Sequence, residues 1–328
     1  MLGLMVMSRN FALSTFSAVT VCALAFGVGA CGSATEESTQ AAATATEDAG
    51  ALNVDAPKLT LVDEGTGEKR VLEYDLTGKK DVVDSGHLYV AQGFSQQMLP
   101  AEGLNPLPPE QSDVIGLNAD YEATSVSSPD ASMVDIVLAS SRFDDLSRAE
   151  QVQSAADGFD VKLSTLPTGQ IRTVSLTAPQ DSADEGRAAV ESLVMALLAT
   201  PVQFPTDPVG EGAVWELDSR VPGSNALLQK TTLTATKISD SGVDLEVSIQ
   251  QRPTQGALDL GDVGLTGELK VQSSQTLSRG KLHVDFTKPV PTSGKVESIT
   301  RIVYGRAGDE GADSTRVVQD MSTQVEYS

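Results

Sequence analysis

The chain has 328 residues, and 45 acidic against 23 basic side chains give it a formal net charge of −22. This charge excludes an ordinary nucleic-acid binder, because few cations would neutralise phosphates. Two cysteines exclude a disulfide-stapled scaffold, a zinc finger and an iron–sulfur protein, and two histidines disfavour a histidine-rich metal or catalytic site. The 40% of apolar residues suffices for a folded core in one large or two medium domains.

Residues 1–30 have the layout of a secretory signal peptide. Arg9 is the only charged residue in this stretch, and residues 11–30 are apolar and small. A retained transmembrane helix is the alternative interpretation, because about 20 apolar residues can span a bilayer. Val28-Gly29-Ala30-Cys31 resembles the lipobox of bacterial lipoproteins, which implies cleavage before Cys31 and diacylation of its thiol. Two acyl chains would attach the protein stably to the extracytoplasmic face of the cell membrane.

The remaining chain is predicted to comprise a tether and a folded body. Residues 31–56 are rich in Ala, Thr, Ser, Glu and Gly, with almost no large apolar group, and are expected to form a disordered tether. A glycosylated stalk is the alternative. We then expect an N-terminal β-rich half at 57–180, a linking helix at 181–203 and a C-terminal β-rich half at 204–328.

Alternation of apolar and polar residues predicts a mainly β fold of antiparallel hairpins. Glycine-containing turns about ten residues apart, among them Thr168-Gly169, Asp240-Ser241-Gly242 and Arg279-Gly280, favour curved sheets or a half-barrel. The residues expected to face the core in the clearest strands are Val134, Ile136, Leu138, Val243, Leu245, Val247, Ile249, Leu282, Val284 and Phe286.

Two helices are expected within this β-rich body. Ser182–Glu185 and Ser147–Glu150 have the pattern of capping boxes, which predicts a main helix over about 183–199 and a short helix over about 147–156. Pro201 is expected to end the main helix. Residues 95–133 are rich in Pro, Ser and Asn, and are interpreted as a long loop or an insertion.

Three short segments recur in the same order, which favours a tandem duplication of a β-meander, with chance similarity between hairpins as the alternative. The matched pairs are Val71–Asp75 with Val214–Asp218, Ala123–Ser127 with Ala235–Ser239, and Thr165–Ile171 with Thr276–Leu282.

The run from Phe204 to Trp215 resembles the P-V-G-x-G-A-x-W signature of a group of actinobacterial cell-envelope lipoproteins of unknown function. The resemblance extends from about residue 57 to 328 and includes Leu72-Glu-Tyr74 and Thr287-Lys-Pro-Val-Pro291. It implies an envelope location and a β-rich body, and brings no catalytic residue. Gly210 and Gly212 are expected to allow a tight turn or a close approach of the backbone. Trp215 is expected to be a core residue, and stacking on a ligand is the alternative. The signature residues are Pro208, Val209, Gly210, Gly212, Ala213 and Trp215.

A search for catalytic and metal motifs finds little. His87 and His283 alternate with apolar neighbours, so each is expected on the polar face of a strand. No G-x-S-x-G, H-E-x-x-H or P-loop motif is present. The low aromatic content of 4% disfavours a carbohydrate-binding site but leaves room for an aliphatic cavity.

The sequence therefore predicts a non-catalytic, lipid-anchored envelope protein that binds an apolar or lipid ligand and needs no cofactor or metal. The alternative is a structural or protein-interaction component of the envelope, and an enzyme is the third hypothesis. The expected partners are the membrane, through acylated Cys31, and a lipid or an envelope protein, with no nucleic acid. A lipid carrier should have a dry cavity on the order of several hundred Å³. An interaction protein should have an exposed apolar patch, and an enzyme should have a polar cleft.

Overall fold

A computed structural model describes residues 50–76, 82–128, 131–221, 227–259, 268–306, 308, 311 and 314–328. These residues belong to one compact unit that spans Glu47–Ser328. The expected signal peptide, the lipobox with Cys31 and residues 31–49 of the expected tether lie outside the described residues. No helix of the described part is both long and apolar enough to span a bilayer.

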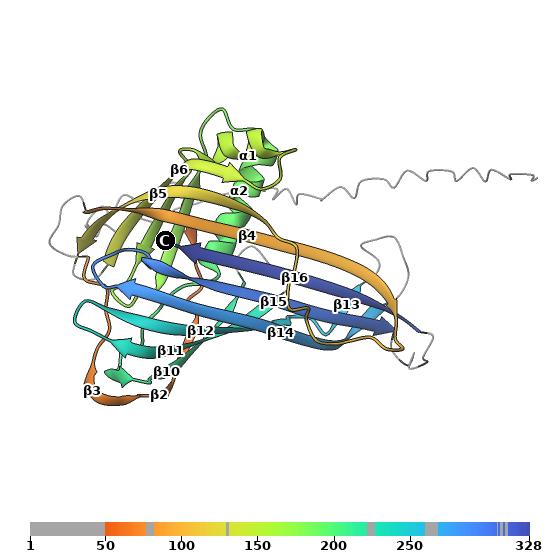
Figure 1. Ribbon diagram of the computed structural model, residues 1–328. Helices are drawn as coiled ribbons and strands as arrows, with labels where there is room; N and C mark the ends of the chain where they lie inside the picture. Colours follow the sequence, from red (N-terminus) through yellow and green to blue (C-terminus); the bar gives the residue numbers. More distant parts are fainter. Residues whose placement is uncertain are drawn as a thin grey trace, which may run out of the picture. The chain divides into compact units, whose positions relative to one another are not determined.

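The expectation of a mainly β fold is confirmed. In the described part of the chain, 14 antiparallel strands form one large open sheet, and β3 (Thr66–Arg70) pairs separately with β9 (Val209–Glu211) (Figure 1). The main path of the sheet runs in the order β1-β8-β7-β6-β5-β4-β16-β15-β14-β12-β11-β10-β2, and β13 pairs with β14. The strands are β1 (Leu52–Asn53), β2 (Lys58–Asp63), β4 (Val82–Pro100), β5 (Ile115–Ser128), β6 (Ala131–Phe143), β7 (Asp160–Thr165), β8 (Ile171–Thr177), β10 (Val214–Arg220), β11 (Leu227–Ile238), β12 (Gly242–Pro253), β13 (Ala257–Asp259), β14 (Glu268–Asp285), β15 (Ser293–Arg306) and β16 (Thr315–Tyr327).

The two halves of the chain share this one sheet. Strands β4 to β8 form one meander and β10 to β16 a second, and the long strands β4 and β16 join the two, with Val90 opposite Val325. The expected boundary at residue 57 is wrong in one respect, because β2 pairs with β10 and β3 with β9. The strands of the segment 58–70 therefore pair with the C-terminal half, and Leu59 and Leu61 pack against the apolar cluster that both halves share.

The predicted alternation is also confirmed. The residues named above in β6, β12 and β14, together with Phe286, are all buried, and one apolar cluster joins both meanders to the helices. Trp215 is fully buried at the start of β10, and its indole N–H donates to the carbonyl of Gln203 at 2.8 Å. Its ring lies 6.4 Å from that of Phe204. Trp215 is therefore a core residue, as expected, and the ligand-stacking alternative is disfavoured.

Both helices lie where they were expected, although their predicted caps are wrong. The helices are α1 (Ala149–Ala156) and α2 (Asp184–Leu198). Neither has a side-chain cap among the described residues, because the serine hydroxyls bond to preceding turns. The Ser182 hydroxyl donates to the Pro179 carbonyl at 2.7 Å, and that of Ser147 donates to the Asp145 carboxylate at 2.7 Å.

The interpretation of residues 95–133 as a long loop is wrong. Most of them lie in β4, β5 and β6, and of the described residues in this range, 101–114 lie between strands. The inward face of β5 carries small residues such as Ala119, Ala123 and Ser125, which are buried but give little hydrophobic signal. The outer part of β4, with Phe94 and Met98, pairs with β16 but is largely exposed, so its sequence lacks alternation.

The segment matches do not mark equivalent places in the two meanders. Val71–Asp75 lies outside any strand whereas Val214–Asp218 lies in β10, and Thr165–Ile171 spans a hairpin turn whereas Thr276–Leu282 lies within β14. Gly280 is therefore not at a turn. A Cβ at this position would lie 2.8 Å from that of Val247, so glycine here permits close approach of β12. Of the three matched pairs, only Ala123–Ser127 and Ala235–Ser239 lie at comparable places, because each lies at the end of a strand, β5 and β11 respectively.

The expected tether also ends earlier than residue 56. Leu52 and Asn53 form β1, opposite Val174 and Thr173 of β8, and the amide of Val54 donates to the carbonyl of Arg172 at 2.9 Å. These residues lack an apolar pattern of their own, and the edge of β8 supplies their backbone partners. Pairing with a sheet edge is not visible in composition.

The two signature glycines have the roles expected of them. Gly212 has a φ of 81°, and Gly210 lies so close to β3 that a Cβ would stand 2.1 Å from the carbonyl oxygen of Thr66. Val209 and Ala213, on either side, are fully buried. The signature therefore builds the junction of β9, β3 and β10.

Replacing Gly210 with alanine is expected to destabilise the protein by about 2 kcal/mol, since the added carbon overlaps backbone that must shift. Urea denaturation measures the change. Gly256→Ala is the matched control, because a Cβ there meets nothing within 4 Å, and it should change the stability by less than about 0.5 kcal/mol. Equal effects of the two substitutions would contradict the close approach at Gly210.

Candidate functional site

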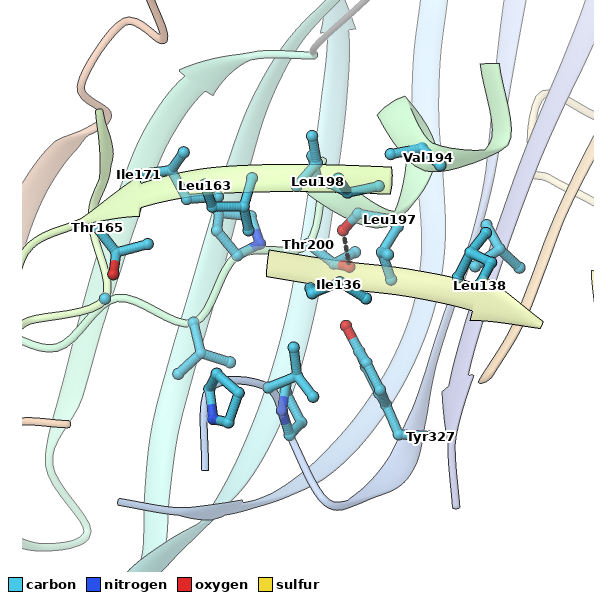
Figure 2. A pocket seen from close by; sticks show the side chains of 18 of the residues that line it. Ile136, Leu138, Leu163, Thr165, Ile171, Val194, Leu197, Leu198, Thr200 and Tyr327 are labelled. Carbon is cyan, nitrogen blue, oxygen red and sulfur yellow. Dashed lines mark hydrogen bonds between the residues drawn. The ribbon is translucent and has the colours of Figure 1, made fainter. Parts of the chain in front are cut away.

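An apolar pocket lies between α2 and the sheet of the N-terminal meander. Its cavity volume is about 100 Å³. Figure 2 shows the side chains that converge on it from β6, β7, β8, α2 and the end of β16. The labelled residues of its wall are Ile136, Leu138, Leu163, Thr165, Ile171, Val194, Leu197, Leu198, Thr200 and Tyr327.

The local sequence explains how these side chains come to face the pocket. Ile136 and Leu138 are two residues apart in β6, as are Val161 and Leu163 in β7, so each pair lies on one face of its strand. On α2, Val194, Leu197 and Leu198 follow the three- and four-residue spacing of one helix face. The helix ends before Pro201, which also lines the pocket.

The segment 287–291 forms a further wall of the pocket through Pro289, Val290 and Pro291. The amide and hydroxyl of Thr287 both donate to the carboxylate of Asp285 at 2.8 Å, which fixes the turn after β14. The ammonium of Lys288 pairs with the Asp84 carboxylate of β4 at 2.5 Å, and the Asp84 side chain is only 7% exposed. This ion pair links the segment 287–291 to β4.

Replacing Lys288 with methionine is expected to destabilise the protein by about 3 kcal/mol, because it leaves the buried Asp84 carboxylate without its cation. Chemical denaturation at pH 7 measures the loss. The exposed pair Lys295–Glu297 supplies the control, since Lys295→Met should cost less than about 1 kcal/mol. The double change Lys288→Met with Asp84→Leu should recover most of the stability, and failure to do so would contradict this explanation.

The polar groups of the pocket are few and uncharged. The side chain of Thr200 is satisfied locally, because its hydroxyl donates to the carbonyl of Leu197 at 3.0 Å (Figure 2). Tyr74 and Tyr327 also line the pocket, and no charged residue is among the described residues of its wall. Burial raises the pKa of both phenols, so both are protonated at neutral pH.

The volume of the pocket falls short of what the lipid-carrier hypothesis expects. About 100 Å³ is below the several hundred Å³ typical of sites that enclose a drug-sized molecule. Apolar cavities of on the order of 150 Å³ nevertheless stay dry and bind small hydrocarbons. In this conformation the pocket suits a short apolar group, such as one end of a larger ligand, and not a whole lipid.

A second hollow borders α2 beside the outer part of β4. It is an open groove of about 820 Å³, with Phe94, Met195 and Met321 among its apolar residues. Phe94 lies opposite Met321 on β16 and is 64% exposed. The hydroxyl of Ser192 on α2 donates to the Gln92 side chain at 2.9 Å, which ties the helix to the floor of the groove. The helix therefore borders both the apolar pocket and this groove.

The two histidines lie on the polar outer face, as expected, and neither lines the pocket. His87 is 3.1 Å from the carboxylate of Asp120, and His283 is 2.5 Å from that of Asp244, each across a strand pair. Both histidine side chains are nearly half exposed. The hydrogen bond from His87 lowers the pKa of Asp120. Among the described residues, no group of three or more His, Cys, Asp or Glu side chains could hold a metal ion.

Asp135 and Asp160 form a close carboxyl pair on β6 and β7, with one buried oxygen of each lacking a hydrogen-bond partner. The ammonium of Lys162 lies 2.8 Å from Asp160 and 3.9 Å from Asp135. Burial, followed by the neighbouring Asp160, raises the pKa of Asp135. The ionised form of Asp135 therefore opposes folding.

Replacing Asp135 with asparagine is expected to stabilise the protein at pH 7. Because the folded-state pKa of Asp135 is raised, its carboxyl contributes to the free energy of unfolding only while it is protonated. That contribution is lost as the pH rises through the folded-state pKa. The gain should therefore vanish in acid, below the unfolded value of about 4. Because the side chain is 39% exposed, solvent limits the gain to less than about 1 kcal/mol. Urea titrations at several pH values measure it, and a gain independent of pH would contradict the assignment.

Sequence reasoning found the signature residues and the histidines but missed the pocket. The signature lies at the β9–β10 junction, and its members Pro208, Val209, Gly210, Gly212, Ala213 and Trp215 do not line the pocket. Tyr74 was noted only within the matched segment Val71–Asp75 and the family resemblance, and the segment 287–291 only within that resemblance. Tyr327 alternates with Val325 at the end of the chain, but nothing in the sequence indicates which side chains it meets.

Comparison with family models, with curated proteins and with solved structures gave no match.

Proposed function

We propose that this protein is a non-catalytic binding module that holds an apolar ligand in the pocket between α2 and the N-terminal meander. The observation that carries the proposal is the lining of this pocket, which consists of apolar side chains with a few uncharged polar groups. Ligand sites of this kind combine a mostly apolar wall with a small number of polar groups that orient the ligand.

The anchor at Cys31 and the extracytoplasmic location complete the proposal. They are supported by the apolar segment 11–30 and by the resemblance of Val28-Gly29-Ala30-Cys31 to a lipobox. The related proposal of membership in the actinobacterial envelope lipoproteins rests on the run from Pro208 to Trp215. Cell fractionation tests the anchor. Cys31→Ala should move the protein from the membrane fraction, whereas Cys22→Ala, within the expected signal peptide, should leave it there.

Calorimetric titration of the purified full-length protein with a series of methyl esters of straight-chain acids tests the binding function. A blank without protein corrects for partitioning into detergent. Each added methylene should tighten the dissociation constant about fourfold, which corresponds to about 0.8 kcal/mol per buried methylene, until the pocket is full. The heat capacity change on binding should be negative. A constant affinity along the series, or no saturable heat, would contradict the proposal.

A role as a protein-interaction component is the second candidate, and the open groove is the observation that favours it. Phe94 and Met98 are 64% and 72% exposed and lie four residues apart on the same face of β4. Large exposed apolar side chains that gather on one surface often mark a contact with another macromolecule. Cross-linking in the intact envelope, compared between wild type and Phe94→Ser, separates this role from ligand binding.

A further inference from the structure

The hydroxyl of Tyr327 points into the pocket from the end of β16. The residue is 7% exposed, and Figure 2 shows its ring standing in the pocket with the hydroxyl oxygen directed toward Ile136 and Thr200. Among the residues that the structure describes, none accepts a hydrogen bond from this hydroxyl. A ligand that supplies an acceptor would therefore give this hydroxyl a hydrogen bond inside the pocket.

Tyr74 places a second phenol on the wall of the same pocket. It is held by its backbone, because its amide donates to the carbonyl of Pro167 at 2.8 Å, and by its ring, which lies 5.3 Å from that of Phe204. Within the described part of the chain, its hydroxyl also has no hydrogen-bond partner. Burial raises the pKa of both phenols, so each is a donor and neither carries a charge at neutral pH.

The surroundings of the two phenols lack a positive charge that a bound anion would need. The described residues of the wall are all uncharged. Lys162, Arg172 and Lys288 each adjoin a wall residue in the sequence, but none of them lines the pocket. The ammonium of Lys288 is engaged by the Asp84 carboxylate at 2.5 Å, and that of Lys162 lies 2.8 Å from the Asp160 carboxylate. A buried carboxylate without a counter-charge is strongly disfavoured, whereas a buried carbonyl needs only a hydrogen-bond donor.

We propose that the pocket binds the uncharged, acceptor-bearing end of an apolar molecule, such as an ester or ketone carbonyl, with the Tyr327 hydroxyl as its hydrogen-bond donor. This inference rests on the proposed binding function and assigns the chemical class of the ligand. Tyr74 lines the same space as a second donor. An ionised fatty acid is excluded by charge, and a pure hydrocarbon leaves both donors unpaired.

Three probes of similar length test this assignment by calorimetry at pH 8, namely methyl hexanoate, hexanoate and n-hexane. The ester should bind at least tenfold more tightly than the carboxylate, which is ionised at this pH. Tyr327→Phe should weaken ester binding about fivefold to tenfold and leave hexane binding unchanged, because only the ester offers an acceptor. Tyr304→Phe is the matched control, since Tyr304 is equally buried but lies in a separate apolar cluster with Ile302, and it should alter neither.

The outcomes separate this inference from the proposed function. If the carboxylate binds as tightly as the ester, or if Tyr327→Phe leaves ester binding intact, the assignment of a neutral acceptor-bearing ligand is overturned while apolar binding stands. If none of the three probes binds with saturation, the proposed binding function fails, and the inference with it.

Discussion

Replacing Val194 with phenylalanine should raise the dissociation constant for methyl esters at least tenfold. Val194 faces the pocket from α2, and a phenyl ring in place of its isopropyl group would occupy much of the cavity of about 100 Å³ (Figure 2). Because the added carbons fill existing space, the free energy of unfolding should change by less than about 1 kcal/mol. Calorimetric titration and urea denaturation measure the two quantities on the same protein.

Met195→Phe is the matched control for this substitution. Met195 is the next residue of α2 but borders the open groove, so a ring there leaves the pocket empty. Ester binding should therefore be retained. Loss of binding in Met195→Phe, with binding retained in Val194→Phe, would place the ligand in the groove and contradict the assignment of the pocket.

Trp215→Ala should cause the largest loss of stability of any substitution considered, about 3–5 kcal/mol. The side chain is fully buried, and its removal leaves a large cavity beside Phe204 at the junction of β9, β10 and the core. It also removes the donor to the Gln203 carbonyl, which would lose its hydrogen bond inside the protein. Chemical denaturation measures the loss.

Trp215→Phe distinguishes the two contributions to this loss. It keeps an aromatic ring in the core but removes the indole N–H, so it should cost about 1–3 kcal/mol. Leu146→Ala is the exposed control, because Leu146 is 88% exposed and should contribute less than about 0.5 kcal/mol. A loss for Trp215→Ala no larger than that of Leu146→Ala would contradict the role of Trp215 in the core.

The strands predictable from sequence are those whose inward residues are large. Val243, Leu245 and Val247 alternate with polar residues, and the sheet buries them on one face. The inward residues of β5 include Ala119 and Ala123, whose small side chains carry a weak signal although both are fully buried. Both helices were located from their capping-box patterns, although the serines of these patterns do not act as caps, because a serine hydroxyl can bond to either side of a helix start.

Pairing between distant segments was not predictable. The edge strands β1 and β2 take their partners from β8 and β10, more than a hundred residues further along the chain. The hairpin glycine expected at Gly280 lies mid-strand, because glycine serves both turns and close strand approach. The sequence pattern identifies a glycine position but does not distinguish these two uses.

The pocket depends on the same long-range assembly. Tyr74 precedes β4, Tyr327 ends β16, and the segment 287–291 follows β14, so its wall combines residues from opposite ends of the chain. Each is an unremarkable residue in its own segment. What makes them a site is the curvature of one sheet shared by both meanders, together with α2 packed against it (Figure 1).

The most direct test of the central claim is to locate a bound ligand in solution. Intermolecular nuclear Overhauser effects between methyl hexanoate and the methyl groups of methyl-labelled protein report which side chains touch the chain. We expect contacts to Ile136, Leu163 and Leu197, which face the pocket. Contacts confined to Met195 and Met321, which border the groove, would contradict the claim that the pocket beneath α2 is the binding site.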